Sequence, residues 1–123
     1  MKTITDEQRL NLLTSALEGG SNYWYEISNA ACKKIDSVKP SDGKTPFVDR
    51  LWAAIQAGKN IEVHDIESRD LLGHISLDTI KQGEVTMLKQ QPQHFADILS
   101  ENDDAVTGDV WFQYCIMNKL IYG

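Results

Sequence analysis

The sequence predicts an α+β fold, a mainly helical single domain that includes a small antiparallel sheet. Apolar residues recur at spacings of three and four over most of the chain, which is typical of helices that bury one face. Between residues 61 and 75 the pattern changes to alternation, which is typical of strands. A length of 123 residues corresponds to one ordinary domain, so we expect residues 1–123 to share a single core.

Two helices are expected in the first third of the chain. Thr5 can cap the first helix, whose leucines recur at helical spacing as far as the Gly19-Gly20 pair. Glycine readily takes the left-handed conformation that closes a helix, so this pair predicts a turn between helices. Ser21 can cap the second helix, which continues to Ile35.

A third helix and two strands are expected in the middle of the chain. After a loop over residues 36–44, Thr45-Pro46 supplies a cap and a proline at the first helical position. The strands are expected at residues 61–66 and 71–75, joined by a polar turn. Two strands alone are marginally stable in water, and residues 119–122 are the natural candidate for a third.

Three helices are expected in the last part of the chain. Ser76 can cap the first of them, in which Gly83 costs about 1 kcal/mol relative to alanine. Pro92 opens a short helix that ends at Ser100. The final helix follows an acidic run, and Asn118 can terminate it in the left-handed conformation.

The composition argues against several classes of protein. Eighteen Asp and Glu against 12 Lys and Arg give a formal net charge of −6, which disfavours general nucleic-acid binding. No apolar run approaches the ~20 residues that span a bilayer, and the polar N-terminus lacks the apolar stretch of a signal peptide. The two cysteines, Cys32 and Cys115, lie in no metal or redox motif, so we expect a reduced, cytoplasmic environment.

The acidic run at residues 101–104 is the most obvious candidate for chemistry. Such carboxylates could hold Mg²⁺ or Ca²⁺, but their spacing fits no calcium loop. We therefore expect Asp103 or Asp104 to cap the final helix, and we predict no metal or cofactor site. Glu101, Asp103 and Asp104 remain candidates for steering a protein partner.

The histidines form no convincing catalytic set. The expected strand pairing places His64 and His74 on opposite faces of the sheet, and a one-residue change of register would reverse this. His94 and Asp97, three residues apart on a short helix, can touch as a base and its orienting acid would. No nucleophile lies near them in sequence, so a structural hydrogen bond is the favoured interpretation and no catalytic residue is assigned.

Aromatic residues just after the Gly19-Gly20 pair give the better indication of binding. Three consecutive helical residues cannot all face inward, because each step rotates the side chain by ~100°. At least one ring should therefore be exposed or packed against another chain, for example in a homodimer; alternatively Trp24 is core and the tyrosines shield its edges. The glycine turn could also hold an anion through free backbone N–H groups. The candidate ligand-binding residues are Gly19, Gly20, Ser21, Asn22, Tyr23, Trp24 and Tyr25.

Two blocks of the sequence together resemble a known group of proteins. One is SALEGGSNYW at residues 15–24, and the other is residues 92–123, which contain HFADILSENDDAVTGDVW and end in IYG. Together they resemble a family of small uncharacterised proteins of tailed phages and prophages. Relatives tend to place glycine where this chain has Asn118, which tolerates the same left-handed geometry. The resemblance implies a phage or prophage origin and supplies no activity.

We therefore expect a non-enzymatic phage accessory protein that acts by binding in the cytosol of the host cell. One concrete form is an anti-defence protein that sequesters a nucleotide-type host signal on its aromatic residues. Two alternatives stay open. The first is an inhibitor that binds a host enzyme through the acidic run, and the second is a small enzyme that uses His94 and Asp97.

Overall fold

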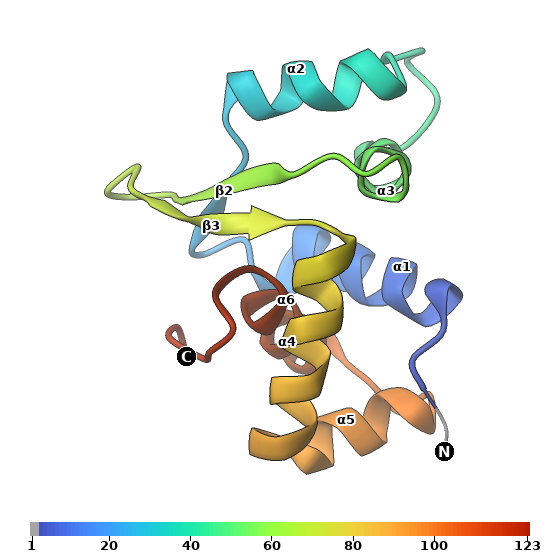
Figure 1. The fold of residues 1–123 in the computed structure, drawn as a ribbon, viewed down its shortest axis with the longest axis vertical. Helices are drawn as coiled ribbons and strands as arrows, with labels where there is room; N and C mark the ends of the chain where they lie inside the picture. The colour runs from blue at the N-terminus through green and yellow to red at the C-terminus, as the bar shows by residue number, and fades with distance from the viewer. Residues whose placement is uncertain (1–2) are drawn as a thin grey trace.

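Six α-helices and a three-stranded antiparallel sheet make up the computed structural model, which describes residues 3–123 (Figure 1). The expected α+β class is therefore confirmed. The elements are α1 (Asp6–Ser15), a π-helical turn η1 (Ala16–Gly20), β1 (Tyr25–Glu26), α2 (Asn29–Val38), α3 (Phe47–Gln56), β2 (Ile61–Asp65), β3 (Leu71–Ile75), α4 (Leu77–Gln90), α5 (Pro92–Leu99) and α6 (Ala105–Met117).

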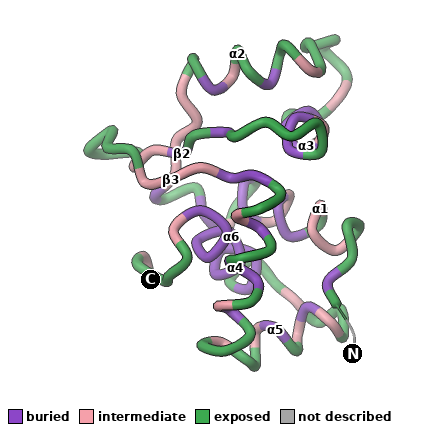
Figure 2. The backbone as a smooth tube through the Cα atoms, in the orientation of Figure 1, coloured by how far each residue is buried: buried purple, intermediate pink, exposed green. Residues whose placement is uncertain are grey.

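The last helix, α6, lies at the centre of the molecule. Every residue from Thr107 to Ile116 is buried, as expected for a helix that is covered on all sides (Figure 2). Helices α1, α4 and α5 and strand β3 all contact it, and the sheet separates it from α2 (Figure 1). Side chains at the start of α6 are therefore held by the whole fold.

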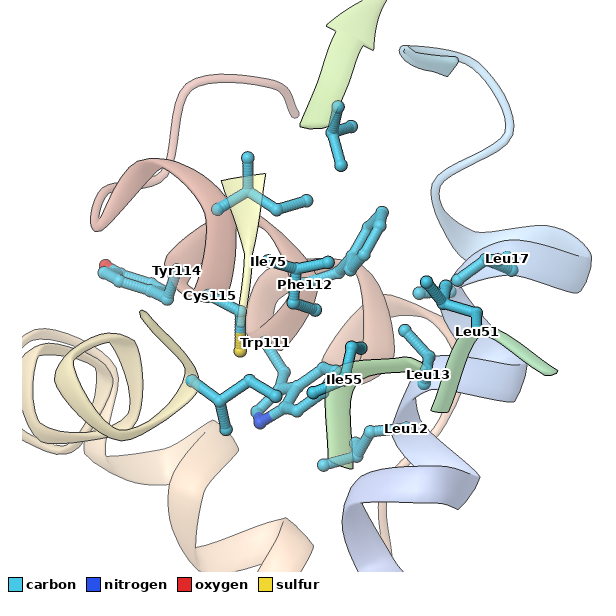
Figure 3. Packing of buried hydrophobic residues seen from close by; sticks show 14 of the residues in the cluster. Leu12, Leu13, Leu17, Leu51, Ile55, Ile75, Trp111, Phe112, Tyr114 and Cys115 are labelled. Carbon is cyan, nitrogen blue, oxygen red and sulfur yellow. The ribbon is translucent and has the colours of Figure 1, made fainter. Parts of the chain in front are cut away.

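The hydrophobic core fills the space between α6, α1, α3 and β3 (Figure 3). Each fully buried leucine or isoleucine in it contributes about 1.5–3 kcal/mol relative to an exposed position. Members from these four elements are Leu12, Leu13, Leu51, Ile55, Ile75, Trp111 and Phe112.

The predicted helix ends are largely confirmed. The Thr5 hydroxyl accepts from the backbone N–H of Gln8 at 3.1 Å, and Oε1 of Gln8 accepts from the backbone N–H of Thr5 at 2.9 Å. Ser76 caps α4, and Asn118 ends α6 with a φ of 57°. The start of α3 differs by one residue, because Pro46 occupies the cap position itself.

Close contact between α4 and α6 accounts for the glycine inside α4. A Cβ atom at Gly83 would lie 2.3 Å from the carbonyl oxygen of Tyr114. The two helices could not approach so closely with any larger residue, so packing offsets the helix-propensity cost of about 1 kcal/mol.

The expected second helix begins seven residues later than predicted. Residues 21–24 form a turn, Tyr25–Glu26 form β1, and α2 starts at Asn29 with Ser28 as its cap. The hydroxyl of Ser21, expected to cap this helix, instead donates to Asp109 at 2.7 Å. A long-range bond therefore replaces the local one.

The third strand is also at a different place in the sequence. The sheet order is β1-β2-β3, so β1 pairs with β2, and residues 119–122 form no strand. The backbone N–H groups of Ile121 and Tyr122 both donate to Oε1 of Gln113 at 2.9 Å. A buried side-chain amide thus satisfies groups that would otherwise need a neighbouring strand.

Candidate functional site

A surface pocket of about 440 Å³ lies between the start of α6, the turn after η1 and the C-terminal segment 118–123. We call it the α6 pocket. Its volume lies within the usual range for small-molecule sites, and apolar side chains with a few polar groups are the usual lining of such sites. The residues that line it include Gly20, Tyr23, His94, Val106, Asp109 and Tyr122.

Asp109 joins this pocket to the turn after η1. Its Oδ1 accepts from the Ser21 hydroxyl and from the indole Nε1 of Trp24, each at 2.7 Å. Its Oδ2 accepts from the Tyr23 hydroxyl, also at 2.7 Å. Hydrogen bonds to a carboxylate are among the stronger ones in proteins, and three of them hold this turn against α6.

The same carboxylate changes the acidity of Tyr23. Desolvation and the hydrogen bond to Asp109 raise the pKa of Tyr23 to about 12. The phenol therefore stays protonated, as a donor to Asp109, throughout the physiological range.

Trp24 and Tyr122 form the aromatic part of the site. Their rings stack with centroids 5.0 Å apart and an interplanar angle of 9°, and Tyr23 meets Tyr122 edge-on at 6.4 Å. Trp24 is fully buried, whereas 52% of Tyr23 is exposed. The alternative in which Trp24 belongs to the core is thus the correct one, and Tyr23 is the exposed ring.

The C-terminal segment is held in place and forms one wall of the pocket. The Tyr122 hydroxyl donates to Oδ2 of Asp65, and the Gln113 amide donates to the Tyr122 carbonyl at 3.0 Å. Desolvation and the bond to Asp65 raise the pKa of Tyr122 to about 12. Tyr122 is therefore anchored at both its ring and its backbone.

His94 lines the pocket but does not pair with Asp97. Its Nδ1 lies 3.0 Å from the Thr107 hydroxyl, and Asp97 accepts from the Gln93 side chain at 3.0 Å instead. The hydrogen bond of His94 is therefore to Thr107, a residue of α6. The base with an orienting acid is not formed.

The seven predicted ligand-binding residues lie in different environments. Gly20 and Tyr23 line the pocket. Ser21 and Trp24 are buried behind it against Asp109. The Tyr25 hydroxyl donates to the Leu17 carbonyl at 3.0 Å, and Gly19 and Asn22 are exposed outside the lining.

Gly20 has a packing role that the sequence did not reveal. A Cβ atom there would lie 2.3 Å from the carbonyl oxygen of Ala105, at the start of α6. Neither lysine nor arginine lines the α6 pocket, so the anion contact expected at the glycine turn has no basic side chain to support it.

The acidic run has the structural role that was favoured. Asp104 caps α6 by accepting from the backbone N–H of Thr107 at 2.9 Å, and this bond lowers the pKa of Asp104. Glu101 is exposed and Asp103 is half-buried. Across residues 3–123, no group of three or more His, Cys, Asp or Glu side chains could hold a metal ion.

The two strand histidines do not follow the expected register. His74 pairs with Glu62, one residue away from its expected partner Val63, and a bulge follows between Val63 and His64. Residues directly opposite each other share a face, so His74 lies on the face of Glu62 and not on that of Val63. The predicted register is therefore wrong, and the prediction that His64 and His74 point to opposite faces no longer follows from it.

The residues that sequence reasoning missed are Asp109, Gln113 and Tyr122. The sequence did mark Asp109 and Gln113, because both are polar residues within the apolar stretch from Val106 to Met117. A buried polar side chain must find partners, but the sequence does not say which ones.

Comparison of the chain with family models, curated proteins and solved structures gave no match. None of the helices within residues 3–123 combines the length and the apolar character needed to cross a bilayer.

Proposed function

We propose that this protein acts by binding a small ligand with a flat ring in the α6 pocket, without catalysing a reaction on it. The observation that carries the proposal is the geometry around Asp109. One buried carboxylate holds both Tyr23 and Trp24, and Trp24 in turn stacks on Tyr122. Two tyrosine rings thus stand fixed at the pocket before any ligand arrives.

Fixed aromatic walls favour a rigid, planar ligand. Holding the side chains in advance reduces the conformational entropy lost on binding. An aromatic pair contributes about 0.5–1.5 kcal/mol beyond the area it buries, so stacking or edge contact with Tyr23 and Tyr122 would favour a ring over an aliphatic chain. The exposed side chain of Val106 supplies further apolar surface at the pocket.

The polar groups at the pocket match the edge of a heteroaromatic ring. Nε2 of His94 can donate or accept according to its tautomer, and Oδ2 of Asp109 has capacity for a second donor besides Tyr23. A nucleobase presents donors and acceptors side by side in this way. With no basic side chain in the lining, attached phosphates would extend into solvent and would not be clamped.

A nucleotide-type host signal is the ligand class that fits both this pattern and the resemblance to phage proteins. Sequestering such a signal in the host cytosol would make the protein an anti-defence factor of a phage or prophage. The His94 and Asp97 alternative has no support from the contacts, because Asp97 bonds to Gln93.

Isothermal titration calorimetry with cyclic and linear nucleotides and their parent nucleosides tests this proposal. We expect at least one ligand to bind with a Kd of ~100 μM or tighter, about −5.5 kcal/mol, and its nucleoside to retain most of that affinity. Val106→Trp should block the pocket without disturbing the fold, because 61% of Val106 is exposed.

Val85→Trp, on a similarly exposed site of α4, is the matched control and should leave binding unchanged. No binding by any member of the panel, or equal binding by wild type and Val106→Trp, would contradict the proposed function.

A protein partner is a second candidate function, favoured by the exposed Glu101 and the half-buried Asp103. Neither carboxylate is used in a side-chain hydrogen bond within residues 3–123, so both are available for steering. Glu101→Gln with Asp103→Asn should slow association with a host protein captured from lysate. Asp104 must be left intact in this test because it caps α6.

A further inference from the structure

A second hollow, of about 280 Å³, lies between α4, α5, α1 and the residues that precede α1. We call it the α4 groove. Four apolar side chains line it, those of Ile4, Val85, Leu88 and Phe95. Ile4 and Phe95 are buried in the fold, whereas 55% of Val85 and 43% of Leu88 are exposed. The groove therefore has a floor that belongs to the core and an apolar wall that is open to a ligand.

The groove runs along α4 and has two different ends. A rise of ~1.5 Å per residue places Leu88 about 10 Å beyond Lys81 along the helix axis, and both residues line the groove. Residues three or four apart share one face of a helix, so Lys81, Val85 and Leu88 follow one another on that face. One end of the groove thus carries an ammonium group, and the other end is apolar.

Arg9 and Glu84 form a closed ion pair at the side of the groove. Glu84 is buried and accepts from Nε of Arg9 at 2.9 Å and from its Nη2 at 2.7 Å. Oε2 of Glu84 also accepts from the indole Nε1 of Trp111 at 3.0 Å. Three donors satisfy this carboxylate and its charge is balanced by Arg9, so it repels an anion far less than a free carboxylate would.

Lys81 gives the groove its net charge. Within residues 3–123 the Lys81 side chain is exposed and takes part in no ion pair. Arg9 and Lys81 against Glu84 leave the lining with one positive charge, although the whole chain carries −6. An elongated apolar groove with one free positive charge at its end is complementary to an amphiphile with one negative charge.

We propose that the α4 groove binds a single-chain aliphatic carboxylate, with its head group at Lys81 and its chain along Val85 and Leu88. Burial of the chain supplies most of the affinity, because apolar surface leaves water on both sides. The ammonium group of Lys81 fixes the direction in which the chain lies. No residue lines both this groove and the α6 pocket, so the proposal is independent of the proposed function.

Nuclear magnetic resonance titration with sodium octanoate tests this proposal, with sodium chloride used to hold the ionic strength constant. We expect saturable shifts of the methyl groups of Val85 and Leu88 and of the indole N–H of Trp111, which is bonded to Glu84. The indole N–H of Trp24, bonded to Asp109 beside the α6 pocket, should not move. The two indole signals therefore report on the two sites separately.

The length of the chain measures the apolar part of the site. From butanoate to octanoate, each added CH₂ should tighten binding by up to about fourfold, as burial of a CH₂ group predicts. The affinity should stop rising once the chain is longer than the groove. An affinity that does not depend on chain length would overturn the proposal.

Two variants act on the apolar wall. Val85→Trp should fill the groove, and Leu88→Gln should weaken octanoate binding about fivefold or more, because an amide replaces apolar surface. Both positions are exposed, so both variants should fold normally. Val106→Trp, which fills the α6 pocket instead, is the matched control and should bind octanoate as wild type does.

Lys81→Gln tests the head group. It should weaken octanoate binding about threefold, as expected for an exposed charge pair, and leave the binding of octan-1-ol unchanged. Lys89→Gln removes an exposed positive charge of α4 outside the lining and should change neither. Equal effects of Lys81→Gln and Lys89→Gln would overturn the assignment of the head group to Lys81.

Shifts that do not saturate, or that are equal in wild type, Val85→Trp and Leu88→Gln, would overturn the proposal. Sedimentation of the protein without ligand provides a second check. A dimer that Val85→Trp dissociates would show that a second copy covers the groove, and this result would overturn the proposal too. Octanoate binding by a protein that binds no nucleotide would support this site while contradicting the function proposed for the α6 pocket.

Discussion

The indole Nε1 of Trp24 donates to Oδ1 of Asp109 at 2.7 Å, across 85 residues of sequence. The same carboxylate also binds Ser21 and Tyr23. In a helix, Tyr23 and Trp24 would point ~100° apart, so they could not converge on one carboxylate. The turn at residues 21–24 is therefore the conformation that lets the candidate site form.

Replacing Asp109 should weaken the fold as well as the pocket. We expect Asp109→Asn to lower the free energy of unfolding by about 1–3 kcal/mol, because an amide cannot accept from all three donors. Tyr23→Phe, which removes one bond from a half-exposed ring, should cost about 1 kcal/mol or less. Urea denaturation followed by tryptophan fluorescence measures both, and an Asp109→Asn variant as stable as wild type would contradict the role given to Asp109.

Two tyrosines should make the protein sensitive to high pH. The pKa values of Tyr23 and Tyr122 are raised to about 12 in the folded state, from an ordinary value of 10.0. A raised pKa stabilises the fold fully below pH 10, and this contribution is lost as the pH rises from 10 to 12. The melting temperature should fall less steeply over this range in Tyr23→Phe/Tyr122→Phe than in wild type.

Ultraviolet titration at high pH provides the direct check on these tyrosines. The tyrosinate absorbance assigned to Tyr23 and Tyr122, by difference from the double variant, should appear near pH 12. Titration of both groups near pH 10 would show that the bonds to Asp109 and Asp65 do not hold in solution.

The cap of α6 should be visible in both stability and pH dependence. Asp104→Ala should cost about 1 kcal/mol at neutral pH, whereas Asp104→Ser should retain most of the cap. The pKa of Asp104 is lowered in the fold, so its contribution is present above pH 4 and lost as the pH falls below that value. The difference between wild type and Asp104→Ala should therefore shrink in acid.

Asp103→Ala is the matched control for this prediction, since Asp103 is not the residue that caps α6. Equal losses of stability from Asp103→Ala and Asp104→Ala in urea titrations would mean that general charge, and not the cap, explains the effect.

The two glycines of η1 should respond differently to the same substitution. Gly20→Ala should destabilise the protein by about 1–3 kcal/mol, because its Cβ would lie 2.3 Å from the Ala105 carbonyl oxygen. Gly19→Ala meets nothing within 4 Å and should be neutral or slightly stabilising. Thermal unfolding of the two variants compares them directly, and similar melting temperatures would show that η1 does not pack against α6 as described.

Much of the fold was predictable because its signals are local. Thr5, Ser76 and Asn118 act within a turn of the helix end that each one stabilises, so their neighbours in sequence are sufficient to assign them. The same local signals reduced the cap of α6 to Asp103 or Asp104, and the structure shows that it is Asp104. The α+β class follows similarly from the periodicity of short segments.

The candidate site was predictable only in part. The aromatic residues after Gly19-Gly20 pointed to the correct region, and Tyr23 is indeed exposed. The partners of these residues, Asp109 and Tyr122, lie in other parts of the chain, about 85 to 100 residues further on.

The sequence by itself therefore determined the class of fold, several of the helix ends and the capping of the last helix by either Asp103 or Asp104. Only the tertiary structure decided that residues 21–24 form a turn, that β1 completes the sheet and that Gln113 holds the C-terminal segment. The physical reason is the free-energy cost of leaving polar groups unpaired in the core. Asp109 and Gln113 are buried in α6, so their hydrogen-bond partners must come from segments distant in sequence.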